Sequence, residues 1–332
     1  MSDSPARKHI WIEPARPEDA RLAQAAADAG ATALVLPMDA DTAGLPRVGP
    51  GGDFQESRDF ERYRIQRQSD EESVRRDRLA VVEPAEWSII PAENLIARGL
   101  EVIQVIDTAE QAKLALTIME QGVAGIWLRQ ADTAAIEALG RVLAELHPAP
   151  VELDEARITA ITPVGMGDRS CLDLIGELAP GEGLLVGSFN HARFLIHSEN
   201  VDNPHCAARP FRVNAGAVHS YVVTPGDQLR YLAEMASGDP ALVVGADGRA
   251  RTLAVGRNKI ERRPMVRVEA IDAEGNCFSV ILQQAETIRL VTPAGQAVSV
   301  LDLKPGDPVR TSLAERGGRH FGRRVTETIF ER

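Results

Sequence analysis

The ionisable side chains of this sequence are concentrated in one stretch, residues 162–221. Charged residues alternate there with apolar residues and glycines, as in TPVGMGDRSCLDL at its start and RPFRVNAGAVHSY at its end. A charge buried among apolar side chains is costly unless a partner or ligand compensates it, so such clusters are more typical of a polar site than of a folding core. The stretch contains four of the seven histidines: His191, His197, His205 and His219.

Two of these histidines and one carboxylate have a spacing that suits acid–base or metal chemistry. His197 and Glu199 are two residues apart in a predicted strand, so both side chains lie on one face. His219 follows in the next strand-like segment. These side chains can bind a divalent metal with open positions, can move protons without a metal, or can form an internal hydrogen-bonded pair. The spacing leaves all three interpretations open.

Two arginines flank a Pro-Phe dipeptide in the segment ARPFRVNAG. The guanidinium groups of Arg209 and Arg212 match the geometry of carboxylates and phosphates, and Asn214 adds an amide donor. This pattern predicts a clamp for an anionic substrate. The alternative is a structural ion pair with Asp168 or Glu199.

Lys259 is one of only four lysines, and it lies in the basic segment VGRNKIERRP. Neighbouring positive charge helps a lysine amine to lose its proton and attack a carbonyl group. The segment predicts either a reactive amine or simply a basic strand face.

The composition argues against several classes of function. The net charge of −11 lacks the basic footprint of a nucleic-acid-binding protein. The sequence has no run of 18 apolar residues, so it predicts no membrane span. The N-terminus lacks the apolar core of a signal peptide. Three cysteines without CxxC spacing indicate a reducing, cytoplasmic setting. A homodimer is expected only because twofold dimers are the commonest assemblies.

The first 150 residues alternate between strands and helices, which is typical of parallel βα units in a partial barrel or an open sheet. The charged segment 56–76 is expected to be a solvated helix or mobile loop, with a lid over an active site as the alternative. Ligands bind at the carboxyl ends of such strands, where Glu13, Glu83 and Asp107 lie, unless these are only surface or capping carboxylates. No GxGxxG follows the first strand, so a nicotinamide cofactor must be held in another way.

After residue 150 the pattern is that of β-strands. Turn signals at Asp247-Gly248, at residues 274–276 and at Ala294-Gly295 predict hairpins. The sequence therefore predicts an α/β protein, with βα units in a domain at residues 1–150 and a β-rich domain with a small barrel at residues 151–332.

Seven segments resemble, in order, the type II, archaeal-type 3-dehydroquinate synthase family, which includes 3-amino-4-hydroxybenzoate synthases. The resemblance runs from about Trp87 to the C-terminus and is dense over residues 161–322. The segments are EWSIIPAENLIA, PVGMGDRSCLDL, HSENVDNP, RPFRVNAGAVHSY, VGRNKIERRP, QQAETIRLV and GGRHFG.

The resemblance implies an enzyme of aromatic biosynthesis, the shikimate route. Its reaction is the NAD-dependent oxidative deamination and cyclisation of 2-amino-3,7-dideoxy-threo-hept-6-ulosonate to 3-dehydroquinate, so the expected partner is a small anionic seven-carbon substrate. The first alternative is a metal-dependent branch that converts a phosphorylated seven-carbon amino precursor to 3-amino-4-hydroxybenzoate. The second alternative is a non-catalytic family member.

Roles for the candidate residues follow from residue type and resemblance together. Lys259 is expected to engage the substrate ketone, and His197, His219 and Glu199 to handle protons. The substrate-binding candidates are Arg209, Arg212, Asn214, Asp168 and Arg169. The same His197, Glu199 and His219 would be the ligands of a divalent metal, Mn²⁺ or Mg²⁺.

Overall fold

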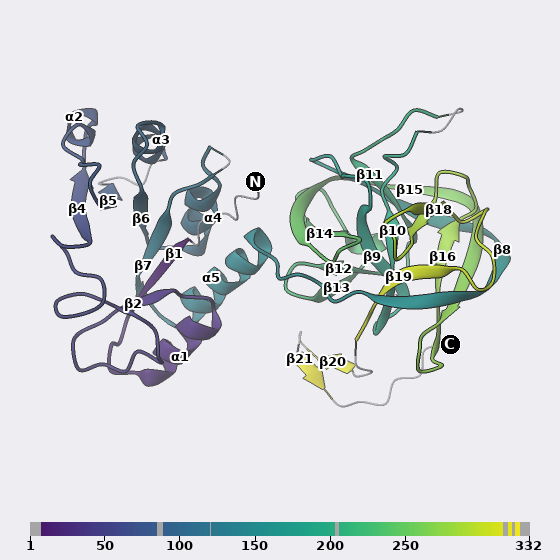
Figure 1. The fold of residues 1–332 in the computed structure, drawn as a ribbon, viewed down its shortest axis with the longest axis horizontal. Coiled ribbons are helices and arrows are strands. Elements are labelled where there is room, and N and C mark those ends of the chain that lie inside the picture. Colours follow the sequence, from purple (N-terminus) through teal and green to yellow (C-terminus); the bar gives the residue numbers. More distant parts are fainter. Residues whose placement is uncertain are drawn as a thin grey trace. The chain divides into compact units, whose positions relative to one another are not determined.

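The computed structural model describes residues 8–84, 89–119, 121–202 and 206–314 in full, and the backbone of residues 318–320 and 323–325. The chain divides into two compact units, Met1–Leu146 and His147–Arg332. The boundary expected at residue 150 lies just beyond the end of the first unit. One unit has a parallel sheet with helices and the other a large antiparallel sheet, which confirms the predicted fold class (Figure 1).

The amino-terminal unit has seven parallel strands, curled as a half-barrel in the order β3-β2-β1-β7-β6-β5-β4. The strands are β1 (His9–Pro14), β2 (Ala33–Val35), β3 (Arg47–Val48), β4 (Phe60–Ile65), β5 (Leu79–Pro84), β6 (Val102–Ile106) and β7 (Gly125–Ala131). The helices are α1 (Ala20–Asp28), α2 (Gln68–Glu71), α3 (Ile90–Ala97), α4 (Ala109–Thr117) and α5 (Thr133–Leu146).

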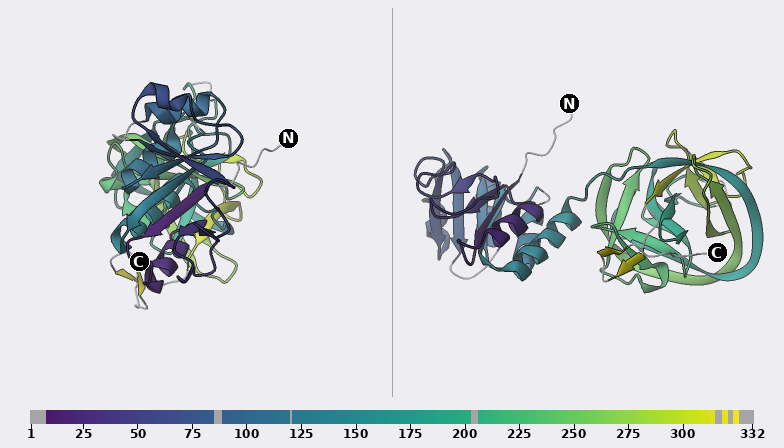
Figure 2. Two further views of the ribbon diagram at one scale, coloured as in Figure 1. Left: turned by 90° about the vertical axis from the view of Figure 1, so that its left-hand side faces the viewer. Right: turned by 90° about the horizontal axis from the view of Figure 1, so that it is seen from below.

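The two faces of this sheet have different partners because side chains alternate along each strand. On β1, Ile10 and Ile12 belong to a core that also contains Leu22 of α1 and the buried residues of α3, α4 and α5. Trp11 lies on the opposite face with Trp127 and other aromatic residues. The helices therefore pack on one face of the sheet (Figure 2), and the aromatic cluster lies on the other.

The segment 56–76 is neither a solvated helix nor a mobile loop, and this expectation was wrong. It contains the edge strand β4, which pairs in parallel with β5, and the short helix α2. Phe60 and Ile65 are buried at the two ends of β4, and charged residues lie between them. Such charges are typical of edge strands, where they discourage pairing with other chains. They also made the apolar pattern too sparse to predict a strand.

The carboxy-terminal unit has a sheet of twelve strands, with the main order β13-β12-β9-β14-β15-β8-β19-β10-β17-β18; β11 pairs with β8 and β16 with β15. The strands are β8 (Asp154–Leu174), β9 (Glu182–Phe189), β10 (Ala192–His197), β11 (Arg212–Ala217), β12 (Tyr221–Thr224), β13 (Gln228–Tyr231), β14 (Pro240–Gly245), β15 (Ala250–Ile271), β16 (Cys277–Gln283), β17 (Arg289–Val291), β18 (Ala297–Ser299) and β19 (Pro308–Leu313). A 3₁₀ helix, η1 (Leu232–Glu234), and the hairpin β20 (Gly318–His320) and β21 (Arg323–Val325) complete the element list.

Two strands of 21 and 22 residues, β8 and β15, organise this unit by pairing antiparallel along most of their length. Most of the other strands pack side chains such as Phe194 and Val243 into one main core with them. The three predicted hairpin turns are confirmed, with Gly248, Gly275 and Gly295 at positive φ. Glycine adopts this conformation without the steric cost that other residues meet.

Candidate active site

Three neighbouring strands of the carboxy-terminal unit share a row of polar side chains. Residues opposite each other in antiparallel pairs point to the same side, so the registers of β11 with β8 and of β8 with β15 define one face. The intervening Leu172 and Val213 point into the main core. We call the other side the polar face; its members are Arg169, Cys171, Asp173, Arg212, Asn214, Arg257, Lys259, Glu261 and Arg263.

Asp173 holds two arginines of the polar face. Arg212 donates to its two carboxylate oxygens at 2.6 and 3.0 Å, and Arg257 donates at 3.0 Å from Nε. Burial opposes ionisation of Asp173, but the hydrogen bonds from the two guanidinium groups outweigh it and lower the pKa. Because Arg212 uses Nε and one terminal nitrogen on this carboxylate, it is mainly an ion-pair partner here, and its partner is neither Asp168 nor Glu199.

Glu199 and Arg209 form the second ion pair of this region. Nη1 of Arg209 lies 3.2 Å from Oε2 of Glu199, and the backbone N–H of Arg209 donates to the carbonyl of Glu199 at 2.6 Å. Glu199 is 6% exposed, and its own N–H donates to the carbonyl of Arg212. This pair is the structural alternative that the sequence left open for Arg209.

Lys259 lies beside a carboxylate rather than among positive charges alone. Its Nζ is 3.2 Å from Glu261, which also accepts hydrogen bonds at 2.8 Å from Arg169 and from Arg263. The hydrogen bond from Lys259 is the main cause that lowers the pKa of Glu261. The lysine side chain is 45% exposed, so its amine can be reached from solvent.

The polar face and its Glu199–Arg209 neighbour carry an excess of positive charge. Six cationic side chains, Arg169, Arg209, Arg212, Arg257, Lys259 and Arg263, meet three carboxylates. Nε of Arg169 and Oδ1 of Asn214 are buried there without a hydrogen-bond partner among the described residues. Asn214 donates from its amide only to Gln283, at 2.9 Å. A bound molecule with anionic and donor groups would satisfy these atoms.

Cys171 lies in the middle of the polar face, but it is not a nucleophile. It is 1% exposed, and burial raises the pKa of its thiol to about 11. The thiol therefore keeps its proton near neutral pH.

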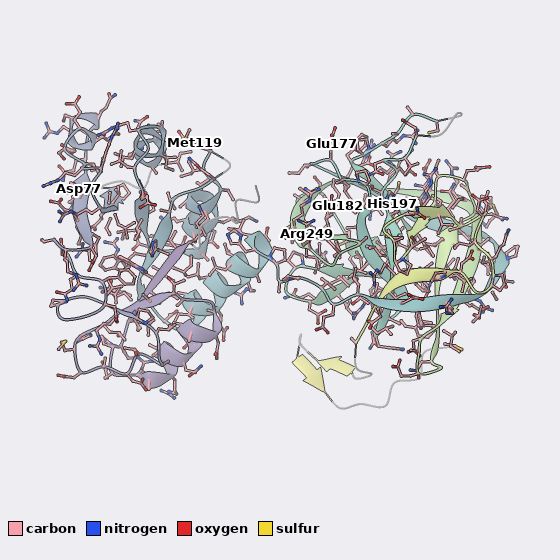
Figure 3. All side chains as sticks on the ribbon, viewed as in Figure 1. Asp77, Met119, Glu177, Glu182, His197 and Arg249 are labelled. Carbon is pink, nitrogen blue, oxygen red and sulfur yellow. The ribbon has the colours of Figure 1, made fainter. Side chains whose placement is uncertain are left out.

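His197 has both ring nitrogens bonded to the backbone. It is 2% exposed at the end of β10, among the strands of its unit (Figure 3). The N–H of Gly181 donates to Nε2 at 3.0 Å, so the ring proton lies on Nδ1, which donates to the carbonyl of Ser198 at 2.6 Å. Burial is the main cause that lowers its pKa. This arrangement leaves His197 no nitrogen for a metal or for proton transfer.

Neither His219 nor Asp168 belongs to the polar face. His219 is in the turn after β11, not in a strand, and desolvation of its partly exposed ring lowers its pKa. Asp168 is exposed on β8 and alternates with Arg169, so it points away from the polar face. Within the described part of the chain, no three His, Cys, Asp or Glu side chains come together as a metal site. The donors expected to bind a metal therefore do not fit one.

The amino-terminal unit has a second polar cluster, at the carboxyl ends of its strands. Arg129 near the end of β7 bridges two carboxylates. Its guanidinium lies 2.5 Å from Glu83 and 2.9 Å from Asp107. Trp127 donates from its indole N–H to Glu13 at 3.1 Å. The sequence indicated the three carboxylates, but it did not indicate Arg129, the side chain that joins two of them.

Comparison with known proteins extends over nearly the whole chain. The model described as 3-dehydroquinate synthase II N-terminal domain matches residues 7–143, and the model described as 3-dehydroquinate synthase II C-terminal domain matches residues 155–332. None of the helices described here has the length and hydropathy that a membrane span requires.

Named relatives cover the same length. The 3-dehydroquinate synthase of Methanoculleus marisnigri is 44% identical over 331 residues, which cover 98% of this chain and 100% of the relative. The 3-dehydroquinate synthase homolog of Aquifex aeolicus is 42% identical over 332 residues, with 97% and 98% covered. The 3-dehydroquinate synthase of Methanocaldococcus jannaschii is 45% identical over 256 residues, with 76% and 70% covered.

Proposed function

The chain belongs to the 3-dehydroquinate synthase II family of enzymes, and we propose that it converts 2-amino-3,7-dideoxy-threo-hept-6-ulosonate to 3-dehydroquinate. The overall reaction consumes water and NAD⁺ and releases ammonium and NADH. The substrate has a carboxylate and an amine at one end and a methyl ketone at the other. Its carbon chain closes when the methyl carbon attacks the carbon that has lost the amine.

The observation that best supports this activity is the excess positive charge on the polar face of an acidic chain. The protein as a whole has a net charge of −11, whereas six cations meet three carboxylates when the polar face and the neighbouring Glu199–Arg209 pair are taken together. A local reversal of charge attracts anionic ligands. The unpartnered Nε of Arg169 and Oδ1 of Asn214 suit a carboxylate and an amine or hydroxyl group respectively.

Lys259 is the residue that engages the ketone in this proposal. Its amine attacks the carbonyl carbon, water leaves, and a Schiff base forms. Loss of a proton from the neighbouring methyl group then gives an enamine, whose carbon attacks the oxidised end of the chain, and hydrolysis releases the lysine. The 45% exposure of Lys259 allows access, and Glu261 at 3.2 Å can exchange protons with it.

His219 is the histidine that suits proton transfer. It makes no hydrogen bond or ion pair within the described residues, and its lowered pKa keeps the ring neutral near pH 7. His197, whose nitrogens are both bonded to backbone groups, is assigned a structural role. Glu199 is assigned to positioning, because it holds Arg209 and the end of β11.

NAD is part of this proposal, and a metal is not. When bound, NAD would supply the acceptor for the hydride that leaves the amine-bearing carbon. His197, Glu199 and His219 do not assemble as metal donors within the described residues, so 3-amino-4-hydroxybenzoate formation stays a prediction from the resemblance alone. A non-catalytic role is disfavoured because the polar face keeps more cations than carboxylates and has buried polar atoms on Arg169 and Asn214 that no described residue satisfies.

Mass analysis of the product tests this function. The purified protein is incubated with the amino heptulosonate, with and without NAD and with and without Mn²⁺. We expect 3-dehydroquinate with equal amounts of NADH and ammonium in every mixture that contains NAD, whether or not Mn²⁺ is present. An aromatic product that needs Mn²⁺ but not NAD, or no product, would contradict the proposal. Lys259→Met should abolish turnover, and Lys304→Met, which removes an exposed lysine elsewhere in the same unit, should not.

A further inference from the structure

A second arginine site lies on β17, three strands away from β8 in the sheet. Ile196 on β10 pairs antiparallel with Leu290 on β17, so the next residues, His197 and Arg289, lie opposite each other. Arg289 also pairs with Ser299 on β18. Leu290 points into the main core, so these three side chains share the other side of the sheet. We call them the Arg289 row.

The guanidinium of Arg289 is buried, and none of the described residues serves as its counter-ion. The residue is 8% exposed, and its one hydrogen bond to the described residues goes to the carbonyl of Thr287 at 3.5 Å, the outer limit of such a bond. Within the described part of the chain, no carboxylate is within ion-pair distance of it. The similarly buried Arg169, by contrast, pairs with Glu261 at 2.8 Å.

The neighbours of Arg289 do not neutralise it. His197 is uncharged: burial, and to a lesser degree the charge of Arg289, lower its pKa, and its Nε2 already accepts the N–H of Gly181. The hydroxyl of Ser299 accepts the N–H of Leu301 at 3.2 Å and keeps its own hydrogen for another acceptor. The row thus presents hydrogen-bond donors around an uncompensated positive charge.

An uncompensated buried cation is costly in a folded protein, and a ligand can remove this cost. We propose that Arg289 and Ser299 form an oxyanion-binding site, which takes a carboxylate or a phosphate group. A guanidinium offers two parallel N–H donors that match either group. Arg289 lies in the segment QQAETIRLV, and neither the polar face nor the proposed chemistry assigns this arginine a role.

The row adjoins the polar face through the chain that follows β10. Glu199 comes two residues after His197, and its N–H donates to the carbonyl of Arg212 on the polar face. If the proposed function holds, the oxyanion is either the substrate carboxylate or a phosphate of NAD. The existence of the site does not depend on that function.

Thermal unfolding with inorganic phosphate or acetate tests the site without turnover. At constant ionic strength, at least one of these anions should raise the Tm of the wild-type protein by a few degrees. Arg289→Gln should lose this rise, and Arg249→Gln, which removes an 87% exposed arginine in a surface turn, should keep it (Figure 3). No rise in the wild type, or equal rises in both variants, would overturn the proposal.

Calorimetric titration with NAD alone and with substrate alone identifies the source of the oxyanion. Arg289→Gln should weaken one of the two at least tenfold: loss of NAD binding assigns a phosphate, and loss of substrate binding assigns the carboxylate. If the affinities for NAD and for substrate both change less than twofold, neither molecule supplies the oxyanion. Arg289→Lys keeps the positive charge but lacks the two parallel N–H donors of the guanidinium, and it should retain part of the binding. This variant also serves if Arg289→Gln does not fold.

Discussion

Arg212 and Arg289 lie in the same sheet, but their surroundings differ. Arg212 gives two hydrogen bonds to the buried carboxylate of Asp173, whereas Arg289 is buried and has no carboxylate partner among the described residues. The sequence drew attention to Arg212 because of its charged neighbours. The structure indicates instead that pairing within the fold decides which arginine remains available for a ligand.

The histidines show the same contrast. His197 has a partner for each ring nitrogen, and His219 has none in the part of the chain described here. A side chain whose polar atoms are all satisfied inside the protein contributes to stability, and one with free atoms can contribute to chemistry.

The largest loss in the free energy of unfolding should follow from removing Asp173, the carboxylate that Arg212 and Arg257 share. Asp173→Ala leaves the charge of Arg212 without its partner in a mostly buried position, and breaking such a pair costs about 3 kcal/mol. Denaturant unfolding should show this loss. Asp247→Ala, which removes a 51% exposed carboxylate from a surface pair, should cost less than about 1 kcal/mol. Equal losses would refute the contrast between buried and exposed pairs.

Substitution of the two histidines should affect different properties, turnover for His219 and stability for His197. His219→Gln should lower kcat about 100-fold and leave the Tm unchanged. His197→Gln should cost about 1–3 kcal/mol of stability, with kcat of the folded enzyme nearly retained. Parallel kinetics and melts measure both. A large fall in kcat for His197→Gln alone would reverse the assignment.

Acid should remove the stabilisation that Asp173 provides as an ionised partner of the two arginines. The hydrogen bonds from Arg212 and Arg257 outweigh burial and hold the pKa of Asp173 below its ordinary value of 3.8. A lowered pKa adds stability that is present above the unfolded value and is lost as the pH falls through the folded one. Unfolding measured from pH 5 to pH 2 should therefore show a shallower loss for Asp173→Asn than for the wild type. Identical slopes would mean that Asp173 is not held ionised by its partners.

The smallest loss of stability is expected for the ion pairs of the amino-terminal unit. Arg129 is 34% exposed, and its partners Glu83 and Asp107 are 30% and 56% exposed. Exposed pairs contribute little, so Arg129→Gln should cost at most about 1 kcal/mol. A loss as large as that of Asp173→Ala would show that exposure is a poor guide to the role of these pairs.

The sequence predicted the elements whose signals are local. The hairpin glycines Gly248, Gly275 and Gly295 lie where the turns were predicted, because a turn signal depends only on neighbouring residues. It did not predict β4, because an edge strand carries charges where a buried one carries apolar residues. The pairing of Arg212 with Asp173 and the enclosure of Arg289 depend on the strand registers, which no local pattern reveals.

Borohydride trapping of Lys259 tests most directly the claim that the polar face engages the substrate. The protein is mixed with the amino heptulosonate, reduced and digested, and its peptides are analysed by mass spectrometry; only three other lysines, Lys8, Lys113 and Lys304, compete for the label. We expect a substrate adduct on the Lys259 peptide. An adduct on another lysine, or none while turnover is normal, would contradict the account.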